Sequence, residues 1–209
     1  MDLKLKKVKT KVTNKLEEQK KIYLFLIIVI IIGVILGTIY GIILNENDHS
    51  LVTTSLNSFF NSIKNNNLDY KAAITNSLIG NILFTTFIFL LGISIIGIPI
   101  IIISLCIKSF IFGFSLSSII YTYHLNGILK ALFYLFPHQV ITLLMSLFLG
   151  FYALYFDIKL FKYLFKGKDI NLRISMKRYL QVYITVLLIN IACSFIEVFL
   201  SPTLIKLFL

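Results

Sequence analysis

The sequence has few charged residues and none of the short motifs on which most enzymes depend. Only 14% of its 209 residues are charged, against 58% that are hydrophobic. One water-soluble core cannot cover so many apolar side chains, so lipid must cover part of them. There is no His-x-x-x-His pair, no Gly-x-Ser-x-Gly, no phosphate-binding glycine loop and no glycosidase-like pair of carboxylates. We therefore expect neither an enzyme nor a bound cofactor or metal ion.

Cysteine and acidic residues are also scarce, and tryptophan is absent. The two cysteines, Cys106 and Cys193, lie in apolar stretches without a second ligand at metal-binding spacing, which indicates buried, inert thiols. Nine acidic residues against 20 basic ones give a net charge of +11. The basic residues gather in separate segments of the chain, a pattern that indicates membrane topology and not a nucleic-acid partner.

Long apolar runs predict an all-α integral membrane protein with five transmembrane helices, the first an uncleaved signal-anchor. The expected spans are residues 22–44, 76–96, 99–123, 137–156 and 179–200. As one helix, residues 76–123 would reach about 72 Å, far beyond a hydrocarbon core of about 30 Å. We therefore expect a hairpin here, with its turn at Gly97 to Pro99, because proline disfavours helix in the residue before it and suits the first turn of a new helix.

The segments outside the spans complete the expected organisation. Residues 1–21 form a basic cytoplasmic N-terminus, residues 22–200 a single membrane domain, and residues 201–209 an outer tail. Residues 45–75 are polar but contain apolar side chains at helical spacing, and residues 124–136 repeat that spacing more strongly. Both patterns predict short amphipathic helices at the membrane surface.

The distribution of basic residues predicts the orientation. Eight precede the first span and seven lie between the fourth and the fifth, whereas the segments expected outside hold four. Because Lys and Arg concentrate in cytoplasmic segments, the N-terminus is expected inside and the C-terminus outside. A single crossing of residues 76–123 would place the seven-charge segment outside, so the charges favour five spans.

Three polar residues inside the expected spans, Lys108, Asn190 and Glu197, form the candidate intramembrane site. Lys108 lies about 14 Å along its helix from Pro99, and Asn190 is at a comparable depth, with Glu197 nearer the outer surface. A lysine in lipid usually faces protein or a watery cavity. We expect Lys108 to be structural and held by Asn190 or Glu197; a coupling site for ions or protons is the alternative.

Glycines and aromatic residues mark expected contacts. Gly33, Gly37 and Gly41 form a doubled Gly-x-x-x-Gly on the first span, which lets another helix approach closely, from this chain or another. Gly97, Pro99 and Gly113 are further turn or packing positions. In the first outer loop, Phe59 and Phe60 are expected to dock a partner protein.

An ordered set of motifs resembles the stage II sporulation protein M family. The set is Leu91 to Ile101, Lys108 with Phe112-Gly113-Phe114, Phe136 to Gln139, and Ile196 to Pro202. The resemblance covers nearly the whole chain. It implies a multi-pass protein of the cell membrane, at the mother-cell septal or engulfing membrane of a spore-forming bacterium. It also implies that the protein acts in engulfment by localising two peptidoglycan-degrading partners, the stage II sporulation proteins D and P.

Two classes of function are thus open, a membrane scaffold and a membrane subunit of a transporter or permease. In the transporter, Lys108 and the hairpin would line a pathway. Transporters usually have repeated halves and helices broken in mid-membrane. This sequence has no convincing internal repeat, and Gly97 to Pro99 lies at an expected inner turn. The scaffold is favoured, with the lipid bilayer and the two hydrolases as partners.

Overall fold

The computed structural model describes residues 2–166 and 171–206, and in these residues it contains helices and no strand. In chain order the elements are α1 (Asp2–Ile42), α2 (Glu46–Lys64), α3 (Tyr70–Leu91), α4 (Gly97–Lys130), η1 (Ala131–Val140), α5 (Ile141–Lys166), α6 (Leu172–Phe195), η2 (Ile196–Leu200) and α7 (Ser201–Ile205), where η denotes a π-helix. Met1, Lys168 of the expected basic segment and residues 207–209 of the expected tail lie outside the described residues.

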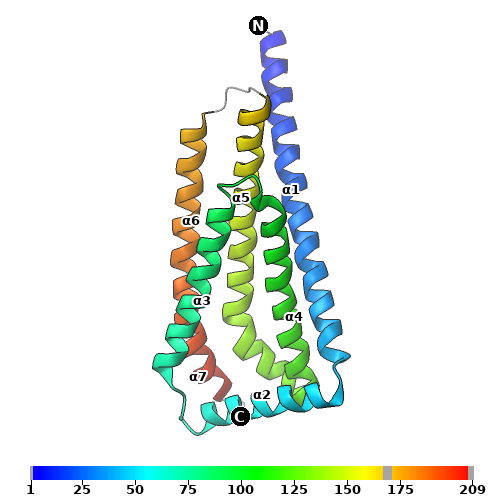
Figure 1. Ribbon diagram of the computed structural model, residues 1–209, viewed down its shortest axis with the longest axis vertical. Helices are drawn as coiled ribbons and strands as arrows, with labels where there is room; N and C mark the ends of the chain where they lie inside the picture. The colour runs from blue at the N-terminus through cyan, green and yellow to red at the C-terminus, as the bar shows by residue number, and fades with distance from the viewer. Residues whose placement is uncertain (1, 167–170, 207–209) are drawn as a thin grey trace.

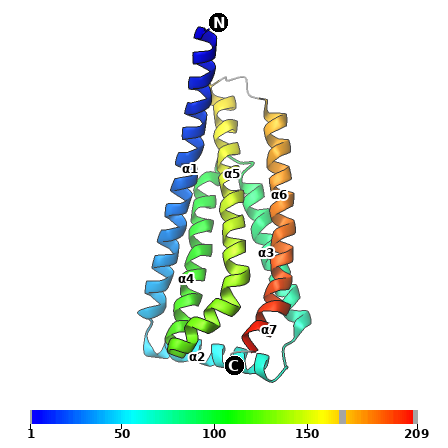
Figure 2. The ribbon, with the colours of Figure 1, turned by 180° about the vertical axis from the view of Figure 1, so that it is seen from behind.

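The long helices α1, α3, α4, α5 and α6 stand side by side, and α2 lies across one end of this bundle (Figures 1 and 2). Four helical runs are long and apolar enough to cross a membrane: Gln19–Ile42, Tyr70–Leu91, Gly97–Phe165 and Leu172–Ile205. Their outward side chains are largely apolar, as in Leu83, which is 63% exposed. The predicted class, an all-α membrane protein, is confirmed.

The third run, 69 residues long, reverses direction inside. His124 has φ 51° and ψ −127°, outside the helical region, and after it the chain folds back so that α5 lies beside α4 (Figure 1). Gly127 permits the reversal, because a Cβ there would lie 2.5 Å from the carbonyl oxygen of Ile119. The reversal is compatible with five crossings, although their number and orientation stay predictions.

The turn between α3 and α4 lies a few residues before the expected position. Helix α3 ends at Leu91 and α4 begins at Gly97, so the expected turn at Gly97 to Pro99 is wrong and Pro99 lies in the first turn of α4, where proline is well tolerated. The reason is a tertiary contact at Gly92. A Cβ there would lie 2.6 Å from the Cβ of Ala153 in α5, so only glycine lets the chain turn against that helix.

The last helices also differ from their expected bounds. Helix α6 begins at Leu172 instead of residue 179. Its first two turns are therefore formed by residues that were expected to belong to the basic segment before the fifth span. Residues 201–205, expected in an outer tail, form α7, in which Ser201, Pro202 and Ile205 are buried. Ile205 packs in a core cluster with Phe60 and Ile63 of α2, so this part of the chain belongs to the bundle.

The glycine face of α1 packs on α4 of the same chain. A Cβ on Gly37 would lie 2.0 Å from the carbonyl oxygen of Phe110, and one on Gly113 would lie 2.2 Å from that of Val34. Gly33 and Gly41 similarly face serine hydroxyls of α4. Because the obstructing atoms at Gly37 and Gly113 belong to backbone, these glycines set how closely the two helices approach.

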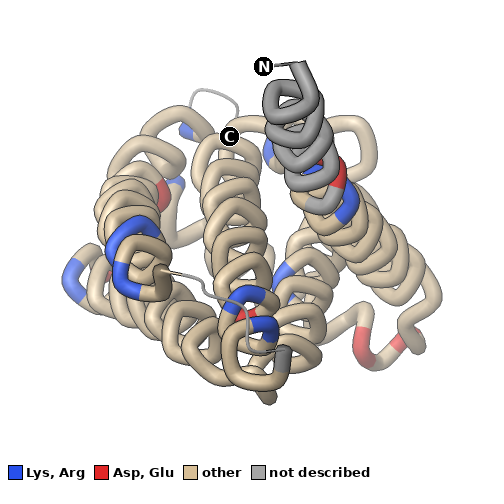
Figure 3. The backbone as a smooth tube through the Cα atoms, turned by 90° about the horizontal axis from the view of Figure 1, so that it is seen from above, with Lys and Arg blue, Asp and Glu red and all other residues tan. Residues whose placement is uncertain are grey.

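Charge is distributed unequally between the ends of the bundle. At the end opposite α2, Lys159 donates a hydrogen bond to Ser175 at 3.0 Å and Arg178 lies beside the same groove, and Figure 3 shows Lys and Arg at these ends of α5 and α6. At the α2 end lie Glu46, Asp48 and fewer basic residues. By the positive-inside rule, the end opposite α2 is predicted to be cytoplasmic.

This orientation predicts a simple labelling result. Single cysteines at the exposed positions Ser58 of α2 and Lys177 of α6, in a chain without Cys106 and Cys193, should react differently with a membrane-impermeant maleimide. Intact cells should be labelled at position 58 alone, and permeabilised cells at both. Labelling at position 177 in intact cells would contradict the orientation.

Candidate functional site

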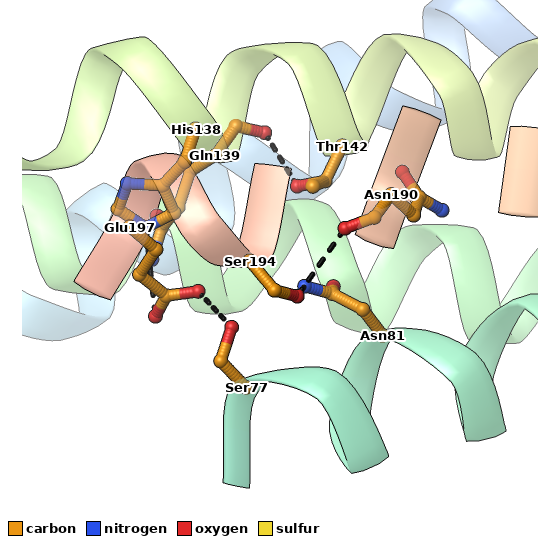
Figure 4. Close-up of polar contacts among 8 residues, drawn as sticks. All are labelled: Ser77, Asn81, His138, Gln139, Thr142, Asn190, Ser194 and Glu197. Carbon is orange, nitrogen blue, oxygen red and sulfur yellow. Dashed lines mark hydrogen bonds and ion pairs between the residues drawn. The ribbon is translucent and has the colours of Figure 1, made fainter. Parts of the chain in front are cut away.

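Helices α3 and α6 are joined through the membrane by a series of side-chain hydrogen bonds, here called the polar ladder. Its members lie at helical spacing on the facing sides of α3 and of α6 with η2 (Figure 4). The hydrogen bonds run from Ser77 to Glu197 at 2.5 Å, from Asn81 to Ser194 at 2.9 Å, and from Asn190 to Thr85 at 2.8 Å. Each of these six side chains thus finds a partner that lipid cannot supply, and the two helices are held in register.

Two π-helices bring the ionisable residues of the site together. Pro137 lies inside η1 and cannot donate a backbone hydrogen bond, which explains the departure from regular α-helix there. His138 of η1 and Glu197 of η2 face each other, with the His138 Nε2 atom 3.7 Å from the Glu197 carboxylate. Such irregular turns are frequent at functional sites. The sequence indicates Glu197 as a polar residue of a span but does not reveal its pairing with His138.

A cavity of about 420 Å³ opens beside this pair, between α3, α4, η1, α5 and η2. Its wall is mostly apolar, and it is called the polar cavity after the charged and polar side chains in that wall. Its polar lining includes Lys108, His138, Gln139 and Glu197, and its apolar lining includes Phe84. Among the described residues, the buried Oε1 atom of Gln139 has no hydrogen-bond partner. The cavity therefore brings charged and polar side chains together inside the bundle.

Lys108 lines the cavity but does not contact the residues expected to hold it. Its Nζ atom donates to the Ser146 hydroxyl at 2.8 Å and lies 4.3 Å from the centre of the Phe84 ring. Asn190 bonds Thr85 instead, so the expected pairing of Lys108 with Asn190 or Glu197 is wrong. The reason is geometric: α5 supplies the nearest acceptor, and the sequence does not reveal which face of α5 meets α4.

The expected docking residues are occupied by contacts within the chain. Phe60 is 3% exposed and packs edge-on against Tyr123 at 5.4 Å, while Phe59 packs against Tyr134 at 5.1 Å. Lys130 lies over the Tyr123 ring at 3.5 Å. This aromatic cluster, formed by Phe59, Phe60, Tyr123 and Tyr134, fixes α2 to the end of the bundle. Phe60 is thus covered by the chain itself. Phe59 is only partly covered and lines a second cavity, so a docking role for Phe59 stays a prediction.

The buried carboxylate of Asp157 in α5 is not predicted from the sequence. Asp157 is 0% exposed, and neither of its oxygens has a hydrogen-bond partner among the described residues. The expected fourth span ended at residue 156, which placed Asp157 in the basic segment beyond it. Helix α5 instead continues to Lys166, and the packing of α6 beside it covers Asp157.

The polar ladder yields a prediction on stability. Asn190→Leu removes the hydrogen bond to Thr85 and should lower the free energy of unfolding by about 1 kcal/mol, the usual size of such bonds between membrane helices. Unfolding in mixed micelles measures it. Leu188→Ala, at a 60% exposed position of the same helix, is the control and should lower the free energy of unfolding by less. Equal effects would show that the ladder contributes no specific stability.

Comparison with known proteins identifies the family of the chain. A family model described as Stage II sporulation protein M matches residues 23–202. The chain belongs to this family. The matched residues of this member of the stage II sporulation protein M family include α1 from residue 23, the other four long helices and the polar ladder. The match confirms the resemblance inferred from the motifs. Searches of curated proteins and of solved structures found no match.

The site of this stage II sporulation protein M family member contains few groups suited to chemistry. Among the residues that the structure describes, no three His, Cys, Asp or Glu side chains lie close enough to hold a metal ion. His138 and Glu197 lie 3.7 Å apart, and Lys108 offers a positive charge to the cavity. The arrangement is therefore suited to binding a polar or charged group inside the helix bundle of this sporulation-related membrane protein.

Proposed function

We propose that this protein is a membrane scaffold of the sporulation engulfment machinery. It recruits peptidoglycan hydrolases, the stage II sporulation proteins D and P, to the septal membrane and contributes no catalytic residue of its own. The family match over residues 23–202 carries the proposal. The hydrolases and the septum come from the family resemblance, and the physical arguments for a scaffold come from the α2 end and the packed core of the bundle.

Helix α2 has the properties of a docking surface. The aromatic cluster and Ile63, which is 0% exposed, hold its inner face against the bundle. Its outer face is rich in Ser, Thr and Asn, and its hydroxyls bond to the helix backbone, as Ser55 does to Leu51 at 2.9 Å. A partner would thus meet a fixed surface that needs little ordering on binding. In the predicted orientation this surface lies outside, where peptidoglycan is.

The packed core of the bundle favours the scaffold over a permease. Ile88, Ile101, Leu105, Leu149 and Ala153 are each at most 1% exposed and form one apolar cluster. This cluster lies between the polar cavity and the groove beside Arg178 at the basic end. A transport pathway would have to pass through close-packed side chains, whereas a scaffold requires such a rigid core.

Deleting the gene tests the proposal. The hydrolases should still be made but should be dispersed in the membrane, and engulfment should stall at septal thinning. Microscopy of fluorescently tagged hydrolases in sporulating cells measures this. Correctly placed hydrolases and normal engulfment in the deletion strain would defeat the proposal.

The docking surface can be tested separately. In the deletion strain, a chain with Ser55→Lys and Ser58→Lys on the outer face of α2 should reach its normal abundance. It should not restore the placement of the hydrolases, because charge disrupts an uncharged interface. Asn67→Lys, in the exposed loop after α2, adds charge away from that face and should restore both. Normal placement with the α2 variant would show that partners bind elsewhere.

A further inference from the structure

We propose that the polar cavity receives a carboxylate side chain from a transmembrane helix of a partner protein, which pairs with Lys108. The inference rests on the proposed function, because the partner would belong to the machinery that this protein recruits. Three features of the cavity support it: a cation without a counter-ion, a half-buried amide in the same cavity, and a lining glycine that faces open space.

Lys108 is a cation without a counter-ion. Its Nζ atom has three N–H donors, and the chain supplies one hydroxyl acceptor, Ser146, and the face of the Phe84 ring. Among the described residues, no carboxylate lies within 4.0 Å of it; the nearest ion pair in the site joins His138 and Glu197. Charged side chains inside membranes almost always pair with an opposite charge or a polar partner. An external carboxylate would supply the missing charge.

One further group of the cavity can bind the same carboxylate. Gln139 lines the cavity and is half-buried, with one end of its amide unsatisfied among the described residues. Since an amide can be rotated, Gln139 can donate to an incoming carboxylate. His138 lines the cavity too, but it is 3% exposed and its Nε2 atom lies beside Glu197, so it stays with that residue.

Gly80 indicates that the carboxylate is carried by a helix of the partner protein. It lines the cavity on α3, and a Cβ built there would meet no atom within 4 Å. The glycines of α1, by contrast, each lie against α4. Glycine inside a helix costs about 0.5–1 kcal/mol relative to alanine, a cost that close approach by another helix offsets. No described helix of this chain makes that approach at Gly80, so the space suits a helix of another protein.

The depth of Lys108 favours a helix over a lipid headgroup. It lies eleven residues after Gly97 and fifteen before Tyr123 in α4, or about 17 Å and 22 Å from those ends at 1.5 Å per residue. Headgroups stay at the membrane surface, so a lipid phosphate would have to enter the hydrocarbon to reach this charge. A spanning helix brings a side chain to that depth without such a cost.

The test measures association of this chain with synthetic helices in vesicles of phosphatidylethanolamine and phosphatidylglycerol. The full-length chain carries a donor fluorophore at a single cysteine at position 177. Single-span Leu/Ala helices carry an acceptor and have glutamate, glutamine or leucine at their midpoint. The glutamate helix should associate about tenfold more tightly than the leucine helix, as expected for a buried pair worth one to two kcal/mol. The glutamine helix should bind only slightly more tightly than the leucine helix.

Two variants locate the binding. Lys108→Met should remove the preference for glutamate. Gly80→Leu, whose Cβ meets no atom of the chain within 4 Å, should weaken binding by filling the open space beside α3. This variant still tests the inference if Lys108→Met does not fold. Leu90→Phe is the control, because it adds bulk at a 60% exposed position of α3 that does not line the cavity, and it should leave binding unchanged.

Several results would overturn the inference. They are equal association of the three helices, a glutamate preference that survives Lys108→Met, or binding that is insensitive to Gly80→Leu. A preference that disappears as the fraction of phosphatidylglycerol rises would assign Lys108 to a lipid headgroup and would also overturn it.

Localisation in cells separates this inference from the proposed function. Hydrolases that stay at the septum with the Lys108→Met chain, but disperse when the gene is deleted, would overturn the inference and leave the scaffold intact. Hydrolases that stay in place after deletion would defeat the scaffold, whatever the vesicles show.

Discussion

Gly37→Ala is expected to lower the free energy of unfolding by about 1–3 kcal/mol, the usual cost of overpacking. The added Cβ would lie 2.0 Å from the carbonyl oxygen of Phe110 and 2.8 Å from its carbonyl carbon. These are backbone atoms, which cannot rotate away, so α1 and α4 must separate and lose contacts along their length. Equilibrium unfolding in mixed detergent micelles measures the loss.

Gly80→Ala is the matched control for this variant. It is the same substitution within another membrane helix, but its Cβ meets nothing within 4 Å. It should keep or slightly raise stability, because alanine is the better helix former by about 1 kcal/mol. If Gly37→Ala were as stable as Gly80→Ala, the α1–α4 contact described here would be incorrect.

Phe60→Ala is expected to release α2 from the end of the bundle. Phe60 is 3% exposed and contacts Phe59, Tyr123 and Tyr134, so its removal should cost about 3–5 kcal/mol of local stability. The measurement is maleimide labelling of a cysteine at position 63, where Ile63 is 0% exposed. That cysteine should be protected when Phe60 is present and labelled rapidly in Phe60→Ala.

The control for this release is another phenylalanine truncation. Phe165→Ala alters a side chain that is 69% exposed at the far end of α5 and should leave position 63 protected. If position 63 were equally protected in Phe60→Ala, then α2 would not depend on the aromatic cluster. Phe60→Ala should also disperse the hydrolases if α2 is their docking surface.

The sequence predicts the helices of this protein better than their contacts. Long apolar runs identify the bundle because lipid and core both require apolar side chains, and the glycines of α1 correctly mark a packing face. The sequence predicts the turn before α4 a few residues too late, because the position of the turn depends on Gly92 lying against Ala153. These residues are far apart in the sequence. A proline signal alone does not contain that information.

The site shows the same division. The spacing of Ser77, Asn81 and Thr85 is visible in the sequence and indicates one polar face, but the pairing with α6 depends on which helices are neighbours. For the same reason Lys108 was assigned the wrong partners. The apolar spacing around Phe60 revealed an amphipathic helix but not that the chain itself covers its apolar face.

The most direct measurement of the central claim is hydrolase binding and peptidoglycan release by purified components. Proteoliposomes with this chain, exposing the α2 end, should bind the stage II sporulation proteins D and P, and liposomes without it should not. The same proteoliposomes, without the hydrolases, should release no peptidoglycan fragments from purified cell wall. Fragment release by this chain alone, or hydrolase binding no greater than that of empty liposomes, would contradict the account.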